Sequence, residues 1–343
     1  MHHIEYFKTF LKDVVDLDDT RLNKLKSRVD AVYRALKSDP VVGPLINGRS
    51  PQGSWAQRTI IKPKPDGEYD ADFLLVMRER PDWEPKDYSN AVYKALSRHP
   101  TYSKQEHGRK CRCIWLKYAP ENGVGCHLDI VPLVTLSDGR NVIVNRDNNT
   151  WEPAFGSTNP QGLTNWVKRR DQLTERQFRR VVRLMKYLRN ERGSFNGVKS
   201  VILTTVLGLQ ITEVSALTPG RYANTPTALV NIVADLDSWL QARPHKPFLS
   251  NPADDGTDFD HRWTESTYRN FRDRIHSIAA AMRAAYDEPD AAKSAKAWSD
   301  LFGDKFNPPP SRSRSSRTLL EPIAGVPMAT GAVSSVSRRG RAG

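Results

Sequence analysis

The chain contains no long hydrophobic run. Its 343 residues include no apolar stretch of the roughly 18 residues that a membrane-spanning helix needs. The first residues, MHHIEYFKTFLKDVV, also lack the apolar core of a secretory signal. We therefore expect a cytoplasmic protein that acts without a membrane.

Cysteine is scarce. There are three cysteines, at positions 111, 113 and 126, and this odd number is typical of a reducing compartment without a disulfide framework. Together with His127 they suggest a zinc site, but zinc-binding cysteines usually lie in turns, two to four residues apart. The spacing favours buried thiols in strands instead.

Two families of catalytic motif are also missing. The sequence has no G-x-x-x-x-G-K-[ST] phosphate loop, and no Ser-His-Asp or Cys-His arrangement stands out. These absences argue against an ATPase of the phosphate-loop class.

Positive charge, in contrast, is abundant. The net charge is +13, which predicts polyanionic partners such as nucleotides or nucleic acid. Ten Lys and Arg residues lie between Lys168 and Arg192 and form a candidate surface for nucleic acid or a regulatory protein. After Phe306 the chain has six arginines, one glutamate and no aromatic residue, so residues 307–343 are predicted to be a disordered Pro/Ser/Arg-rich tail.

The periodicity of the body predicts an α+β protein with two lobes. Residues 1–150 should form an N-terminal helix, capped by Asp19, and a lobe with a mixed sheet; residues 151–306 should form a helical lobe. The predicted strands are Tyr69–Met77, Arg112–Tyr118 and Cys126–Val134. The predicted helices are Pro85–Ser97, Thr174–Arg192, Val198–Gln210, Thr225–Ala242, Thr264–Asp287 and Asp290–Phe302.

Three aspartates lie inside the predicted strands. Asp70 and Asp72 are two residues apart, so their side chains should project from the same face of one strand. Asp129 occupies the middle of another apolar strand. Because carboxylate oxygens are the ligands of hard divalent cations, the three acids could form a platform for two metal ions.

A Gly-Ser pair precedes the first of these strands. Gly53 allows the backbone to approach a phosphate, and Ser54 adds a hydroxyl at an expected helix start, where main-chain amides favour anions. Such pairs are usually ordinary turns, so only the combination with the three acids is informative.

The motifs QGS, EYDADFLLV and CHLDIVPLV together resemble the polymerase-beta nucleotidyltransferase superfamily, and most closely its bacterial cGAS/DncV-like branch, the CD-NTases. The resemblance extends from Gln52 to the segment DLFGDKFNP, residues 300–308. It implies a nucleotidyltransferase lobe followed by a helical lobe, with the active site in the cleft between them. It also implies synthesis of cyclic oligonucleotide signals in antiphage defence.

The resemblance implies specific residue roles. Asp70, Asp72 and Asp129 would bind two Mg²⁺ ions, with Mn²⁺ as a possible substitute. Gln52, Gly53 and Ser54 would contact the phosphates of a nucleoside triphosphate such as ATP. In the helical lobe, VVRLMKYLRN points to Lys186 and GVKSVILTTVL to Ser200 as further triphosphate contacts.

The sequence is also compatible with two other functions. A related transferase that extends RNA or tRNA ends, or makes linear oligoadenylate, would share every catalytic residue. A non-catalytic nucleic-acid-binding protein could use the Lys168–Arg192 segment, with strong salt dependence.

The chain ends in SRRGRAG. This resembles ubiquitin-like tails, in which a terminal glycine is activated by an E1-type enzyme and joined to a target. Gly343 is therefore a candidate conjugation point for an E1/E2-like partner.

Overall fold

The computed structural model describes residues 2–121, 123–153 and 160–307. Seven strands in this part form one mixed sheet with the order β1-β2-β5-β4-β3, and β6 pairs with the end of β5 and with β7. β2 and β5 run parallel to each other, and every other pair in the sheet is antiparallel. The strands are β1 (Ile46–Gln52), β2 (Glu68–Arg78), β3 (His107–Arg109), β4 (Ile114–Glu121), β5 (Val124–Thr135), β6 (Asn141–Asn145) and β7 (Thr150–Pro153), with a separate hairpin of β8 (Ser250–Asn251) and β9 (Asp254–Asp258).

The helices follow the predicted α+β order, which confirms the fold class. No helix within the described ranges is long and apolar enough to cross a membrane. The helices are α1 (Ile4–Phe10), α2 (Asp19–Lys37), α3 (Gly53–Ala56), α4 (Pro85–Arg98), α5 (Pro160–Leu173), α6 (Phe178–Arg192), α7 (Ser200–Leu209), α8 (Glu213–Ala216), α9 (Thr225–Gln241), α10 (Glu265–Asp287) and α11 (Ala291–Phe302).

Local capping explains where these helices begin. The prediction that Asp19 caps α2 is wrong, because the Asp18 side chain accepts the hydrogen bond from the main-chain N of Arg21 at 2.8 Å. α4 begins with a capping box between Glu84 and Asp87.

The predicted helix Thr174–Arg192 starts four residues late, at Phe178. Glu175 and Arg176 have φ values of 51° and 67°, a left-handed conformation that a continuous α-helix excludes. The tight turn that they form separates α5 from α6.

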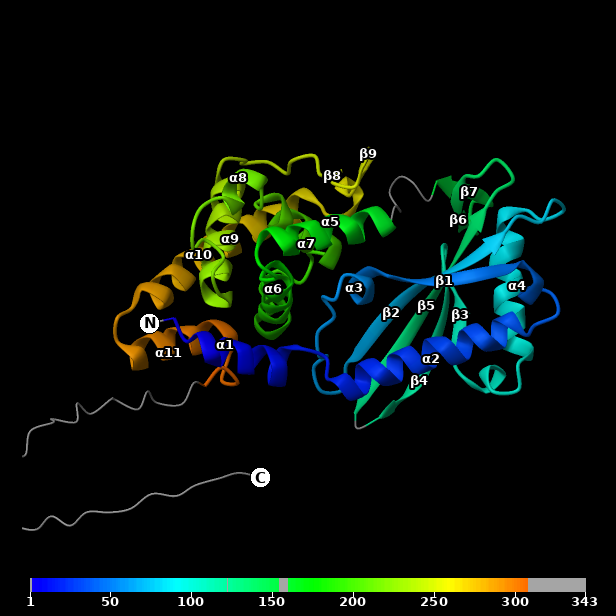
Figure 1. Cartoon of the computed structure of the whole chain (residues 1–343), viewed down its shortest axis with the longest axis horizontal. Helices are drawn as coiled ribbons and strands as arrows, with labels where there is room; N and C mark the ends of the chain where they lie inside the picture. Colours follow the sequence, from blue (N-terminus) through cyan, green and yellow to red (C-terminus); the bar gives the residue numbers. More distant parts are fainter. Residues whose placement is uncertain (1, 122, 154–159, 308–343) are drawn as a thin grey trace, which may run out of the picture. The chain divides into compact units, whose positions relative to one another are not determined.

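The described residues contain two main hydrophobic cores. One lies between the sheet and the helices α2 and α4, which run along the same side of it (Figure 1). Tyr69, Ala71 and Phe73 of β2 point into this core, so the intervening positions 70 and 72 face the opposite side.

The second core is helical and includes the first residues of the chain. Phe7 and Phe10 of α1 and the adjoining π-helix, Leu11–Val15, pack with α6 and α11, as the position of α1 beside α11 illustrates (Figure 1). The sequence predicted that residues 1–150 form the sheet lobe. The division between the two cores differs from this boundary, because residues 4–15 pack in the helical core. Their aromatic rings contact Trp298, Phe302 and Phe306.

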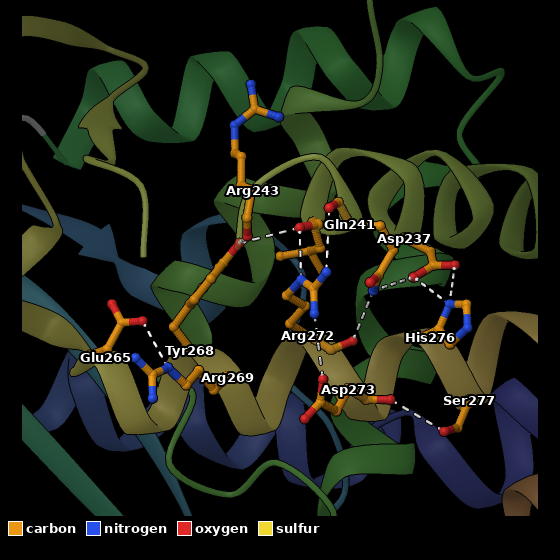
Figure 2. Close-up of polar contacts among 11 residues, drawn as sticks. Asp237, Gln241, Arg243, Glu265, Tyr268, Arg269, Arg272, Asp273, His276 and Ser277 are labelled. Atoms are coloured by element: carbon orange, nitrogen blue, oxygen red, sulfur yellow. Dashed lines mark hydrogen bonds and ion pairs between the residues drawn. The ribbon is translucent and has the colours of Figure 1, made fainter. Parts of the chain in front are cut away.

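Side chains of α10 complete the hydrogen bonding at the end of α9 (Figure 2). Tyr268 donates to the carbonyl of Arg243 at 2.6 Å, and Arg272 donates to the carbonyls of Leu240 and Gln241 at 3.2 and 3.3 Å. The last carbonyls of a helix have no complete set of intrahelical partners, and the α10 side chains supply donors to them; the Leu240 carbonyl also accepts from the main-chain N of Arg243 at 2.9 Å. These hydrogen bonds join α10 to the end of α9, and both helices contribute to the hydrophobic core that also contains α6 and α7.

Candidate active site

The parallel pair β2 and β5 brings the three predicted acids together. In the strand register Asp72 lies beside Asp129, and Asp70 lies beside His127. Adjacent strands are about 4.8 Å apart, so the side chains of one row share one face. This is the face opposite α2 and α4, where Asp70 is exposed and Asp72 and Asp129 are partly buried.

The carboxylate of Asp72 has an unusual electrostatic environment. Burial, followed by the negative charges of Asp70 and Asp129, raises the pKa of Asp72 to about 7. In the described part of the chain, no hydrogen bond or ion pair satisfies the side chains of Asp70 and Asp72. A bound cation would compensate this concentration of negative charge.

Asp129 has two cationic or polar neighbours, His127 and Lys110. The His127 Nε2 atom lies 2.9 Å from its Oδ1, and the Lys110 ammonium donates to both carboxylate oxygens at 3.2 and 3.1 Å. Burial alone would raise the pKa of Asp129, but His127 and Lys110 together hold it below its usual value. His127 was predictable from its position on the same strand face, whereas Lys110 lies outside any strand.

These contacts also bear on metal binding. No three His, Cys, Asp or Glu side chains of residues 2–121, 123–153 and 160–307 already converge as a formed metal site. Instead, Lys110 supplies positive charge at Asp129. Asp70 and Asp72 have no partner among the described residues, and the Lys110 ammonium neutralises Asp129. Carboxylate oxygens of this kind fit hard divalent cations once the Lys110 side chain moves away from Asp129.

The Gly-Ser pair lies directly against the acids. Gly53 has a φ of 61°, and a Cβ atom at this position would lie 2.4 Å from Oδ2 of Asp72. Glycine is thus required twice, by the backbone conformation and by the close approach of the carboxylate. Ser54 follows on the first turn of α3.

The helical lobe contributes positively charged side chains to the site. Lys186 is only 4% exposed. Its ammonium donates to the carbonyl and hydroxyl oxygens of Thr59 at 2.9 and 3.1 Å. Burial and the nearby charge of Arg189 lower the pKa of Lys186 to about 7, with Asp70 acting in the opposite direction.

Arg189 is the functional candidate that the sequence did not single out. Its guanidinium lies 3.4 Å from the hydroxyl of Ser200, the first residue of α7, and donates to the carbonyl of Val198 at 2.8 Å. It lies three residues after Lys186, which places both side chains on neighbouring parts of the α6 surface. That three-residue spacing was the sequence signal from which Arg189 could have been predicted.

All eight candidates within the described residues line one cavity of about 520 Å³. This volume is within the usual range for small-molecule sites. The cavity receives side chains from the sheet lobe and from α6, α7 and the segment after β9, where Arg262 lies. The predicted residues are Gln52, Gly53, Ser54, Asp70, Asp72, Asp129, Lys186 and Ser200. Gly343 lies outside the described residues.

Eight of the ten basic residues of the Lys168–Arg192 segment make internal contacts, and three of them, Arg169, Arg179 and Arg183, form ion pairs with carboxylates. The contacts are Arg169 with Glu213, Arg170 over Trp166, Arg179 with Asp171, Arg180 with Gln177, Arg183 with Asp16, Lys186 with Thr59, Arg189 with Ser200, and Arg192 with carbonyls of α11.

A mixed sheet that presents acids on two adjacent parallel strands, facing cationic helices across one cavity, defines a nucleotidyltransferase of the polymerase-beta type. Comparison with known proteins gives a narrower class. The Second Messenger Oligonucleotide or Dinucleotide Synthetase domain matches residues 1–171. The chain belongs to the bacterial cGAS/DncV-like nucleotidyltransferases.

Individual relatives are distant but cover most of the chain. A c-di-GMP synthase of Roseivirga ehrenbergii is 25% identical over 78% of this chain and 76% of its own length. A cyclic AMP-AMP-AMP synthase of Acinetobacter sp. is 22% identical over 88% of this chain and 84% of its own length. The crystal structure of Vibrio cholerae DncV, a cyclic AMP-GMP synthase in complex with nonhydrolyzable GTP, has a TM-score of 0.65 at 13% identity, covering 90% of this chain and 97% of DncV.

Proposed function

We propose that this protein is a Mg²⁺-dependent synthase of a cyclic di- or trinucleotide, made from nucleoside triphosphates as a second messenger in antiphage defence within the cytoplasm. The observation that carries this proposal is the single cavity in which three strand carboxylates face Lys186, Arg189 and Ser200. Negative groups suit metal ions and positive groups suit a triphosphate, so both parts of a metal–nucleotide substrate have partners.

Each group of residues in the cavity has a separate role in the proposed reaction. Asp70, Asp72 and Asp129 would hold two Mg²⁺ ions, or Mn²⁺ in their place. Metal ions at these acids would activate the acceptor hydroxyl and neutralise the leaving pyrophosphate. Gly53 and Ser54 would hold the donor phosphates from the sheet side.

Asp129 would receive the proton of the acceptor 2′ or 3′ hydroxyl, consistent with a pKa below its usual value that keeps it ionised. The acceptor oxygen then forms a bond to the α-phosphorus of the donor, and the bond to the β-phosphate oxygen breaks to release pyrophosphate. A repeated transfer within the linear product closes the ring.

The curated relatives support cyclisation rather than release of a linear chain, because both are named synthases of cyclic products. To test this, the protein is incubated with Mg²⁺ and all four labelled triphosphates, and the products are treated with phosphatase and identified by mass spectrometry. We expect a phosphatase-resistant cyclic product that includes adenosine or guanosine. A phosphatase-sensitive chain would favour a linear transferase, and the absence of any product would favour a non-catalytic binder.

The helical side of the cavity can be tested separately. Lys186→Met keeps most of the side-chain volume, and Ser200→Ala removes one hydroxyl. Since a hydrogen bond to a charged group contributes about 1.5–3 kcal/mol, we expect Lys186→Met to weaken binding of a nonhydrolysable ATP analogue by roughly 10- to 100-fold. Ser200→Ala should have a smaller effect.

Lys168→Ala is the matched control, since Lys168 is an exposed lysine on α5 outside the cavity. Calorimetric titration of the three variants measures the affinity, and melting temperatures report folding. Parental affinity in Lys186→Met would contradict the assignment of Lys186 to the triphosphate.

The tail supports a separate proposal about a partner. The motif SRRGRAG at residues 337–343 resembles the tails of ubiquitin-like proteins, whose glycine is joined to target proteins. We propose that an E1/E2-like enzyme joins Gly343 to target proteins, while the tail takes no part in nucleotide synthesis.

Deletion of residues 311–343 should therefore preserve synthesis in vitro and remove higher-mass conjugates from cells that carry the native operon. Gly343→Asp should have the same effect on conjugates, whereas Gly340→Asp should leave them in place. Immunoblots of the chain read out the conjugates, and conjugates that persist after the deletion would disprove this role.

A further inference from the structure

Thr59 lies between the two sides of the cavity without lining it. It is fully buried, with 0% exposure, in the segment between α3 and β2. Its main-chain N donates to the carbonyl of Ser54 at 2.9 Å. Its carbonyl and hydroxyl oxygens both accept from the Lys186 ammonium, at 2.9 and 3.1 Å. One residue thus connects the Gly-Ser turn of the sheet lobe with the lysine of α6.

These contacts are well suited to orient a charged group. An ammonium has three protons, and Thr59 accepts two of them, which leaves one donor for a phosphate oxygen. Lys186 makes no ion pair within the described part of the chain. The charges that act on it are Arg183 and Arg189 of its own helix, which disfavour its protonation, and Asp70 of β2, which favours it.

The same segment is fixed to α6 at the preceding residue. Arg183 donates to the carbonyl of Arg58 at 2.9 Å and forms an ion pair with Asp16 at 2.6 Å. The backbone of residues 58 and 59 is therefore held against the helix even without the threonine hydroxyl. The hydroxyl remains free to serve Lys186 specifically.

We propose that Thr59 is a positioning residue for the donor triphosphate: it fixes the Lys186 ammonium in place relative to Ser54, so that both meet the same phosphate chain. This inference rests on the proposed function, because it needs a triphosphate in the cavity. It adds a residue that touches neither substrate nor metal and acts through the lysine.

The decisive variant is Thr59→Val, which keeps the shape and the main-chain contacts but removes the hydroxyl. Loss of this acceptor should disfavour the protonated lysine, whose pKa of about 7 already lies near neutrality. A triphosphate binds the protonated lysine. Above this pKa the lysine must take up a proton when the triphosphate binds, and that uptake weakens binding. Below this pKa the lysine is already protonated and binding is unaffected. We expect Thr59→Val to weaken binding of a nonhydrolysable ATP analogue by about tenfold at pH 8.5, for a pKa lowered by about one unit, and by much less at pH 6.0.

Two control variants isolate the hydroxyl. Thr59→Ser retains it and should bind like the parent. Thr205→Val makes the same substitution at a buried threonine of α7 whose hydroxyl has no hydrogen-bond partner among the described residues. It should leave affinity unchanged at both pH values.

Calorimetric titrations of the full chain at pH 6.0 and 8.5 give the result, and NMR titration of the Lys186 side chain in parent and variant gives an independent one. Thr59→Ala serves in place of Thr59→Val if the valine variant does not fold. An equal loss of affinity at both pH values, or no loss, would overturn the positioning role while leaving the proposed function intact. Failure of the parent to bind the analogue would instead overturn the proposed function, and this inference with it.

Discussion

The double variant Asp70→Asn with Asp72→Asn is expected to lose product formation by at least about a thousandfold, the scale of several kcal/mol of transition-state stabilisation. Two of the three carboxylates proposed to hold metal are removed, while Tyr69, Ala71 and Phe73 still pack into the core below. Turnover of labelled triphosphates measures the loss. Full activity in the double variant would disprove the nucleotidyltransferase assignment of this cavity.

The same variant should be more stable than the parent in the absence of metal. The pKa of Asp72 is raised to about 7 in the folded protein, against an ordinary value of 3.8. A raised carboxyl pKa means that the folded state binds the extra proton between these values, so the parent loses stability as pH rises from about 4 to 7. The full penalty, at most about 4 kcal/mol, is present at pH 8.

The melting temperature of Asp70→Asn with Asp72→Asn should accordingly exceed that of the parent by several degrees at pH 8 in the presence of a chelator, and the difference should shrink towards pH 4. Asp13→Asn with Asp304→Asn removes two exposed carboxylates instead and should shift neither the melting temperature nor the activity. A pH-independent gain in the active-site variant would rule out the electrostatic explanation.

Gly53→Ala is the second variant with a large expected effect. Its Cβ would lie 2.4 Å from Oδ2 of Asp72, a distance that forces the carboxylate to move. We expect a 100-fold or greater loss of turnover, about 3 kcal/mol or more, because a metal-binding group and the phosphate-binding turn are displaced together. The fold should survive, since the cost of the left-handed backbone for alanine is about 1–2 kcal/mol.

Gly220→Ala provides the matched control for this backbone cost. Gly220 has a φ of 74°, similar to the 61° of Gly53, but a Cβ there meets nothing within 4 Å. Both variants should lower the melting temperature by a similar amount, while only Gly53→Ala lowers turnover. Equal activities in the two variants would show that the approach of Gly53 to Asp72 has no catalytic importance.

Much of the sheet lobe was predictable because its signals are local. The alternation of Tyr69, Ala71 and Phe73 with the acids is a property of a single strand, and it predicted both the strand and the face on which Asp70 and Asp72 lie. The start of α4 follows from a proline and its capping box, within four residues of sequence.

Other elements were missed because competing local signals hid them. β1 was not predicted because it contains Gly48 and Pro51, residue types that weaken a strand; pairing with β2 nevertheless makes residues 46–52 a strand. The switch to a left-handed backbone at Glu175 and Arg176 has no sequence signal of its own, because neither residue favours that conformation.

The sequence by itself determined the strand acids and the helical order that follows, because each depends on residues a few positions apart. Only the tertiary structure decided that Lys186 is buried, that Lys110 contacts Asp129, and that Arg189 and Thr59 belong to the same site. Those facts depend on which distant segments meet. The burial of Lys186, for example, results from the packing of residue 59 against α6 across 127 positions of sequence, a contact that no periodicity in either segment encodes.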